Sequence, residues 1–441
     1  MNDLFEKAPV PKAYMQLALP VVLGMVASMV YNLVDTFFIA QTGDANLVAG
    51  VTLGAPVFSF MLAVGDIFGL GGSALISRLL GDRDYAQVKR LSSFCLYAGI
   101  AISLVISALM LTFEQPILTL LGATAATRAD AGGFYRMLAI GAGFIIVSLV
   151  PGNIIRTEGL AKDSMIATIS GTVLTIILDP LFLFGFGWGA SGVGLANVLG
   201  YALNTMLLLW FTQRETQYLS ILPQQAKASA AAIKAIIAIG IPASLTNFMQ
   251  SFGTMLLNQH LAPYGADMVA AMGIAQKIYM IVMLIMVGFA FGAQPLIGYN
   301  YGAKNYRRFH EILRFDFKIE LGYALVAAVL LMIGATPLVR LFMAMPVIVA
   351  NGTLMLRALL ITTPAVGAIL VFTTVFQSLG KGTSALVMAI SRQGVLFAIS
   401  MVILAQVFGF HGIVWAQATA DLLTCALGYW LYRRVAHHLQ A

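Results

Sequence analysis

Two carboxylates stand inside long apolar stretches of the sequence, and they are the residues best placed to do chemistry. Asp35 belongs to one polar stripe on an otherwise apolar helix, because other polar residues recur with it at helical spacing: Ser28, Tyr31 and Asn32. A charge at bilayer depth costs about 2.5–3.5 kcal/mol on insertion scales, so such residues usually face a wet cavity. In the alternative interpretation, Asp35 lies at a helix end near the headgroups. We favour a functional carboxylate, because the apolar run continues beyond Asp35.

Asp179 is the second carboxylate, and it shares a predicted helical face with Thr168, Thr172 and Thr175. Pro180 follows it directly, lacks a backbone donor and clashes with the carbonyl one turn back, which leaves acceptors free near Asp179. A third polar face is predicted in the next apolar stretch, from Asn197, Tyr201 and Asn204.

Converging carboxylates with amide and hydroxyl neighbours suit a small cation. A carboxyl group removed from water can bind a proton, because desolvation disfavours its charged form. Asp35 and Asp179, with hydroxyl or carbonyl ligands, could instead hold sodium, a hard cation that prefers oxygen. For Asn197 and Thr175 an interhelical hydrogen-bond cluster that stabilises the bundle remains an alternative.

The elements that must position these residues are membrane helices. The chain has 441 residues, of which 60% are hydrophobic and 10% charged, whereas a soluble domain has about 25% charged residues. Twelve apolar stretches can each span about 30 Å of hydrocarbon as a helix. They are roughly 14–40, 47–77, 91–113, 134–155, 164–186, 190–212, 233–260, 267–298, 317–340, 353–377, 384–408 and 411–432.

Other classes of protein are disfavoured by what the sequence lacks. Basic residues are spread over connectors and form no dense patch, so no nucleic-acid partner is expected. Cys95 and Cys425 lie inside apolar stretches, which argues against a disulfide framework or a cysteine metal site. No phosphate-binding GxxxxGK or zinc-binding HExxH motif occurs. We therefore expect no enzyme and no cofactor other than a coupling ion, H+ or Na+.

The connectors alternate in charge. One set carries most of the Lys and Arg residues, for example Arg78, Arg83 and Lys89, whereas opposite connectors such as 41–46 and 261–266 carry none. By the positive-inside rule both termini are cytoplasmic. The first apolar stretch exceeds the core of a signal peptide and is read as a retained helix.

The chain repeats itself at an offset of 221 residues, which pairs Gly71 with Gly292, Pro116 with Pro337 and Gly159 with Gly380. Each half has six predicted helices that start on the same side, so the halves are parallel repeats. We expect an all-α polytopic membrane protein with two six-helix bundles around a central cleft. The predicted N-lobe is 1–213, the cytoplasmic linker 214–232 and the C-lobe 233–441.

The two halves differ in charge. Stretch 233–260 has a polar face without any acid, which includes Asn247 and Gln250, so the titratable pair is expected in the first half. Lys277 and Arg392 lie inside apolar stretches and either pair with an acid, Asp421 being one candidate, or contact substrate. Pro20 and Pro180 are predicted hinges. The substrate or cavity candidates are Tyr31, Asn32, Tyr201, Asn204, Asn247, Gln250, Lys277 and Arg392.

The twelve helices in two parallel repeats resemble the multidrug and toxic compound extrusion (MATE) transporters, and so do the runs Val34-Asp35-Thr36-Phe37 and Leu178-Asp179-Pro180. Members with a cation site in the N-lobe build it from a helix-one Asp, a helix-five Asn and Asp, and a helix-six Thr. The resemblance places that site at Asp35, Thr175, Asp179 and Asn197. Thr175 stands where Asn is usual and Asn197 where Thr is usual, and Gln250 stands where another branch has Glu.

The resemblance implies a secondary antiporter in the bacterial inner membrane that exchanges cationic and amphipathic drugs for protons or sodium. Its expected partners are the lipid bilayer and small organic molecules, and a functional monomer is expected. The main alternative is a flippase for lipid-linked oligosaccharides or lipids, which should have a more basic lumen.

Overall fold

The computed structural model describes residues 3–437, so the outermost residues of the two predicted lobes lie outside it. Every regular element in that range is helical. The first half contains η1 (Asp3–Lys7), α1 (Val10–Gln41), α2 (Ala45–Gly81), α3 (Tyr85–Thr112), α4 (Glu114–Leu120), α5 (Arg128–Ile140), α6 (Ala142–Ile154), η2 (Ile155–Glu158), α7 (Ala161–Pro180), η3 (Leu181–Gly185) and α8 (Gly189–Glu215). After η4 (Pro223–Gln225) follow α9 (Ala230–Leu261), η5 (Ala262–Tyr264), α10 (Ala266–Gly302), α11 (Tyr306–Ile333), α12 (Ala335–Phe342), α13 (Pro346–Ile361), α14 (Thr363–Ser378), α15 (Gly382–Ile390), η6 (Ser391–Val395), α16 (Leu396–Phe408) and α17 (Phe410–His437).

The helices of this range account for the predicted membrane spans. Eight segments are long and apolar enough to cross a membrane singly, and three bent pairs bring the number to 11. The pairs α5–α6, α11–α12 and α13–α14 bend by 50°, 69° and 44°. The twelfth segment is α17. It is long enough to span a membrane but is less apolar, because it contains polar residues such as the buried Gln417 and Asp421. The predicted all-helical fold of twelve segments in two repeats is confirmed.

The repeat is visible in local conformation as well as in sequence. Arg83 and Lys304, one offset apart, both have positive φ, of 62° and 55°. Each is followed by a helix cap, because the side chains of Asp84 and Asn305 accept hydrogen bonds from the backbone of α3 and α11. The same local chemistry therefore starts the third span of each half.

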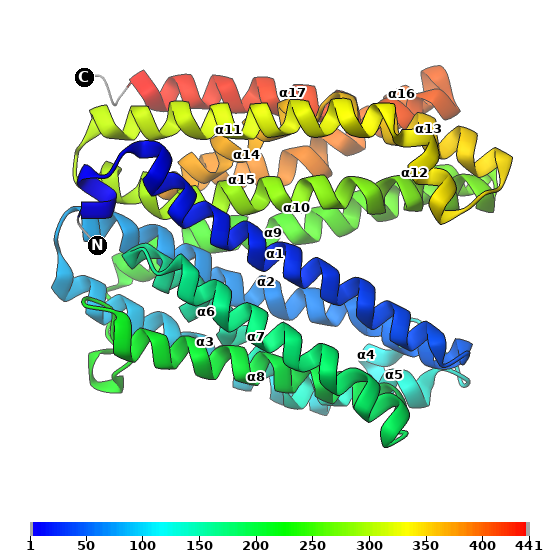
Figure 1. Cartoon of the computed structure of the whole chain (residues 1–441), viewed down its shortest axis with the longest axis horizontal. Helices are drawn as coiled ribbons and strands as arrows, with labels where there is room; N and C mark the ends of the chain where they lie inside the picture. Colours follow the sequence, from blue (N-terminus) through cyan, green and yellow to red (C-terminus); the bar gives the residue numbers. More distant parts are fainter. Residues whose placement is uncertain (1–2, 438–441) are drawn as a thin grey trace.

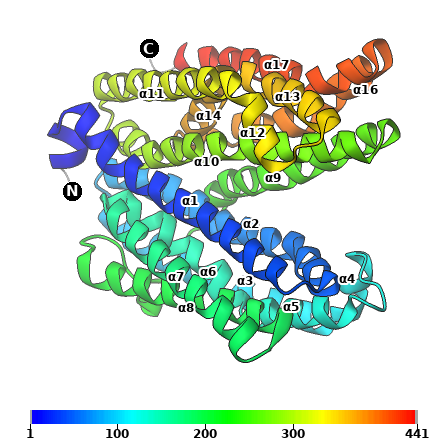
Figure 2. The same cartoon turned by 45° about the vertical axis from the view of Figure 1, so that its right-hand side comes forward.

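The two halves pack through their first two spans. α2 contacts α9 and α10, and α1 packs along α10. Each half therefore contributes two helices to the interface between the halves. Gly81 and Gly302, again one offset apart, allow α2 and α10 to touch, since a Cβ on either would meet the backbone of the other helix. Figure 2 shows the halves close together near η1 and spread apart toward the α1–α2 and α9–α10 turns. Figure 1 shows the first half, from blue to green, below the second.

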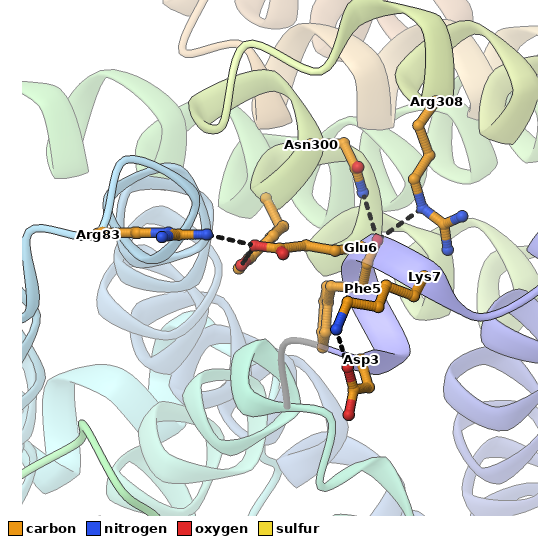
Figure 3. Close-up of polar contacts among 8 residues, drawn as sticks. Asp3, Phe5, Glu6, Lys7, Arg83, Asn300 and Arg308 are labelled. Carbon is orange, nitrogen blue, oxygen red and sulfur yellow. Dashed lines mark hydrogen bonds and ion pairs between the residues drawn. The ribbon is translucent and has the colours of Figure 1, made fainter.

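The end of the molecule near η1 is closed. A hydrophobic core there joins both halves and includes Tyr14 of α1, Leu80 of α2 and Tyr299 of α10. Polar contacts of η1 reinforce it (Figure 3). Glu6 accepts a 2.7 Å hydrogen bond from Tyr299 and pairs with Arg83 at 3.4 Å. Arg308 of α11 donates to the carbonyl of Phe5 at 2.6 Å. The segment before α1 therefore binds both halves at one end.

Candidate functional site

A cavity of about 330 Å³ lies within the first half, lined by α1, α7 and α8 with contributions from α2 and α5. Most of the residues predicted for the first-half site line it, and they come from α1 and from the consecutive helices α7 and α8. They are Tyr31, Asn32, Asp35, Thr175, Asn197, Tyr201 and Asn204. The polar stripes of the three helices thus face one another, as their helical spacing predicts.

Asp179 lies directly beside this cavity. It is 1% exposed, and its carboxyl group lies close to that of Asp35. Within the described range neither oxygen of Asp179, nor Oδ1 of Asp35, has a hydrogen-bond partner. Two adjacent carboxyl groups with free oxygens are costly to bury as anions, and a bound proton or metal cation would relieve that cost.

Asn197 and Thr175 are held in fixed orientations. Tyr31 donates a 2.7 Å hydrogen bond to Oδ1 of Asn197, whose amide nitrogen donates to the carbonyl of Val193 at 3.1 Å. Thr175 donates to the carbonyl of Gly171 at 3.0 Å. The hydrogen bond from Tyr31 joins α1 to α8, so an interhelical polar contact exists here in addition to any ligand role.

Two glycines bring the site together. A Cβ on Gly171 would lie 2.5 Å from the carbonyl oxygen of Gly200, and a Cβ on Gly200 would overlap Oγ1 of Thr175. α7 and α8 therefore approach at backbone distance, as small residues allow between membrane helices. This close approach places Thr175, Asp179 and Asn197 around one space.

The charge of this cavity is negative. Its lining includes the carboxylate Asp35 and no Lys or Arg. Phe58 also lines it and lies edge-on to Tyr201, with 5.7 Å between the ring centroids. An acidic space with aromatic walls favours cations of either inorganic or organic kind.

A second cavity of about 870 Å³ lies between the halves, where α2 and α9 diverge. Asn247 and Gln250, both predicted cavity residues, line it. Its other polar lining residues are Ser59, Ser251, Thr254, Asn258 and Gln259, and no charged residue lines it. It is large enough for a drug-sized molecule and offers hydrogen-bonding groups without a fixed charge.

In the second half, larger residues occupy the positions equivalent to the two glycines of the first-half site. One offset from Gly171 and Gly200 stand Arg392 and Asp421, which form a buried ion pair at 2.9 Å. Thr362 donates to the same carboxylate at 3.0 Å and Gln417 at 2.9 Å. Arg392 lines neither cavity described above. Lys277 is exposed, also lines neither cavity, and forms no ion pair within residues 3–437.

The predicted hinges lie at different kinds of position. Pro20 is inside α1, which continues to Gln41. Pro180 ends α7, and the π-helical turn η3 follows it. A π-turn widens the helix, which agrees with a proline that removes the regular hydrogen bond there.

A second pair of buried carboxyl groups lies in the second half, where the sequence analysis expects none. Asp316 and Glu320 of α11 are both 0% exposed and lie one helical turn apart. The predicted span starts at residue 317, which leaves Asp316 in a connector. In the structure α11 begins at Tyr306 and includes Asp316. The spacing of two acids in an otherwise apolar helix is the signal that could have identified them.

The chain is similar to known proteins over most of its length. The MatE family model matches residues 20–181 and 242–403, one stretch in each half. The multidrug export protein MepA of Staphylococcus aureus (strain NCTC 8325 / PS 47) is 31% identical over 423 residues, which cover 96% of this chain and 93% of the relative. MepA of Staphylococcus haemolyticus (strain JCSC1435) is 29% identical over 435 residues, 99% of this chain and 96% of the relative.

Solved structures share the fold. An outward-facing conformation of a multidrug resistance MATE family transporter of the MOP superfamily superposes with a TM-score of 0.93 at 24% identity. That match covers 100% of this chain and 98% of the other. A crystal structure of MATE in complex with MaD5 superposes with a TM-score of 0.92 at 25% identity, and the match covers 99% and 98%.

Proposed function

The chain belongs to the MatE family of multidrug efflux transporters, and from this premise we propose that it exports cationic and amphipathic drugs in exchange for protons or sodium by alternating access. The observation that carries the proposal is the pair of carboxyl groups, Asp35 and Asp179, beside a cavity that no Lys or Arg lines. The relatives named above are multidrug export proteins, which supports drugs as the cargo.

In this proposal the coupling cation binds at Asp35 and Asp179, with Thr175 and Asn197 as neutral oxygen ligands. A proton would neutralise one carboxyl group and let the two share it, whereas sodium would take oxygens from all four residues. Coupling requires that the cation and the drug favour different facing states, since a ligand shifts an equilibrium only by its differential affinity.

The drug would occupy the cavity between the halves, in contact with Asn247 and Gln250. Amide and hydroxyl groups can hydrogen-bond to varied compounds, and the apolar surface of α2 and α9 can bind their hydrophobic parts. Entry of the coupling cation into the first-half cavity would change the position of α1, because α1 lines that cavity and also packs on α10. α1 is therefore the proposed link between the two ligands.

We place the protein in the bacterial inner membrane as a functional monomer, with both termini in the cytoplasm. The closed end near η1 is then cytoplasmic, and the structure faces outward. The lobes would be 1–213 and 233–441, joined by the linker 214–232. A flippase for a pyrophosphate-linked lipid is disfavoured, because neither of the two cavities is lined by Lys or Arg.

Ethidium efflux from cells that express the protein tests the proposal, with the proton and sodium gradients collapsed separately. Efflux that stops with only one of the two gradients would identify the coupling ion. If efflux is absent under every gradient while folded protein is present in the membrane, the drug antiporter is rejected.

A further inference from the structure

α11 buries two carboxyl groups that the proposed antiport mechanism does not use. Asp316 and Glu320 are four residues apart on one helical face, and both are 0% exposed. Of their four side-chain oxygens only Oδ1 of Asp316 has a partner, the hydroxyl of Tyr14, which donates at 2.7 Å. Oδ2 of Asp316 and both oxygens of Glu320 have no hydrogen-bond partner within the described part of the chain.

No cation compensates these carboxyl groups. None of the ion pairs among residues 3–437 involves Asp316 or Glu320. The basic neighbours on the same helix, Arg314 and Lys318, are exposed. Two uncompensated carboxylates one turn apart in a low-dielectric interior would cost several kcal/mol each. At least one carboxyl group of the pair must therefore carry a proton in this conformation.

The groups that face the pair come from four helices. α1 supplies Tyr14, and Tyr323 of α11 is the other titratable neighbour. α10 contributes the backbone of Ala290, and α14 contributes Gly367, where an added Cβ would lie 3.3 Å from the carbonyl oxygen of Glu320. The polar side chains that neighbour the pair are thus tyrosine hydroxyls. α14 carries no charged residue along Thr363–Ser378.

The ligand of this site is a proton rather than a metal ion. Neither cavity described above reaches Asp316 or Glu320. Hard metal cations take six or more oxygen ligands, more than the pair and Tyr14 provide. A proton needs one oxygen and no space.

We propose that Asp316 and Glu320 form a proton-binding site in the second half that is closed by Tyr14 and exchanges its proton with water when α1 moves away. In uptake, hydronium transfers a proton to a carboxylate oxygen and leaves as water. In release, the carboxylic acid returns the proton to water. This site is separate from Asp35 and Asp179, so it goes beyond the proposed antiport.

α1 connects the two carboxyl sites. Tyr14 and Asp35 lie on the same helix, about 30 Å apart along its axis, with Pro20 between them. Near Pro20, α1 touches α10 closely, because a Cβ on Gly288 would lie 2.8 Å from the Cα of Val22. A bend of α1 at Pro20 would therefore change the contact of Tyr14 with Asp316.

Infrared difference spectroscopy on the purified full-length transporter tests the proposal. The C=O stretch of a protonated carboxyl group is followed through a pH titration and through exchange into deuterated water. The background is the Asp35→Asn/Asp179→Asn variant, which removes the signals of those two carboxyl groups. We expect a pH-dependent, deuterium-sensitive band that loses one carboxyl equivalent when Glu320→Gln is added. Tyr14→Phe should shift the frequency of the remaining band, because the hydroxyl no longer donates to Asp316.

Glutamine has the shape of a protonated glutamate, so Glu320→Gln should fold, and Asp316→Asn provides a second test. A spectrum unchanged by both substitutions, or a carboxyl band that neither titrates nor exchanges, would overturn the proposal. The measurement needs no drug and no gradient. A failure of the proposed antiport function would therefore leave the spectral result intact, and the two failures can be told apart.

Discussion

Tyr31 of α1 donates a 2.7 Å hydrogen bond to Oδ1 of Asn197 on α8, across the cavity that holds Asp35. The two residues are 166 positions apart in the sequence. The hydrogen bond orients the side-chain amide of Asn197 so that its nitrogen donates to the carbonyl of Val193. Movement of α1 away from α8 would break it. Asp35 lies one turn further along α1, so the proposed cation site and the position of α1 share this contact.

Tyr31→Phe removes this hydrogen bond and keeps the ring. A typical hydrogen bond contributes about 0.5–1.5 kcal/mol, so the apparent affinity for the coupling cation should fall about two- to tenfold. Efflux measured against cation concentration gives that affinity. Tyr429→Phe is the matched control, since Tyr429 is 53% exposed on α17. Equal effects of the two substitutions would contradict the role given to Tyr31.

Gly200→Ala should disrupt the first-half site by overpacking. The added methyl group would overlap Oγ1 of Thr175 and force α7 and α8 apart, at a cost of about 1–3 kcal/mol. We expect a lower unfolding temperature and loss of efflux. Gly322→Ala on α11 meets nothing within 4 Å, and should leave stability unchanged or raise it. A Gly200→Ala protein as stable and active as the wild type would show that the close approach is dispensable.

The buried ion pair of the second half should be structural. Arg392→Ala or Asp421→Ala leaves an uncompensated charge inside the bundle, which costs about 3–5 kcal/mol in comparable cases. The double variant Arg392→Met/Asp421→Leu should recover much of that loss. Thermal unfolding in detergent measures both. The exposed pair Arg307–Glu311 is the control, and its removal should cost about 0–1 kcal/mol. If the single variants are stable but lose efflux, Arg392 contacts substrate instead.

Glu6→Gln should loosen the closed end of the molecule. It weakens the contacts with Tyr299 and Arg83 that tie η1 to both halves (Figure 3). A change of about 0.5–1.5 kcal/mol would lower the fraction of outward-facing molecules about two- to tenfold if that fraction is small. Distances between spin labels in the α1–α2 and α9–α10 turns report the facing state. Asp3→Asn is the control, because Asp3 pairs only with the exposed Lys7 in the same turn. An unchanged distance distribution in Glu6→Gln would rule out this role.

Helical spacing was sufficient to predict the first-half cavity. The stripe that ends at Asp35, the face that carries Thr175 and Asp179, and the face of Asn197 meet because each helix buries its polar side. The offset of 221 residues also predicted which turns would share a conformation, as Arg83 and Lys304 do. These features depend on local periodicity and on repetition, which a single sequence records.

Other features depend on packing between distant segments and could not be predicted. The angle of 69° between α11 and α12, and the π-turn η6, have no distinct local signal in the sequence. Asp316 was missed because α11 extends well beyond the apolar stretch that marks its span. Asp421 was predicted as a candidate partner of Arg392 and the ion pair confirms it, but the choice between ion pairing and substrate contact required knowledge of which helix α17 would face.

The most direct test of the account uses Asp35→Asn in proteoliposomes, beside the wild type at equal amounts of folded protein. Drug transport is measured with an imposed proton gradient and, separately, with an imposed sodium gradient. Asparagine keeps the shape of the side chain and removes its charge, so the cation should no longer bind. The account predicts that one gradient drives transport by the wild type and neither drives transport by Asp35→Asn. Gradient-driven transport that persists in Asp35→Asn would contradict it.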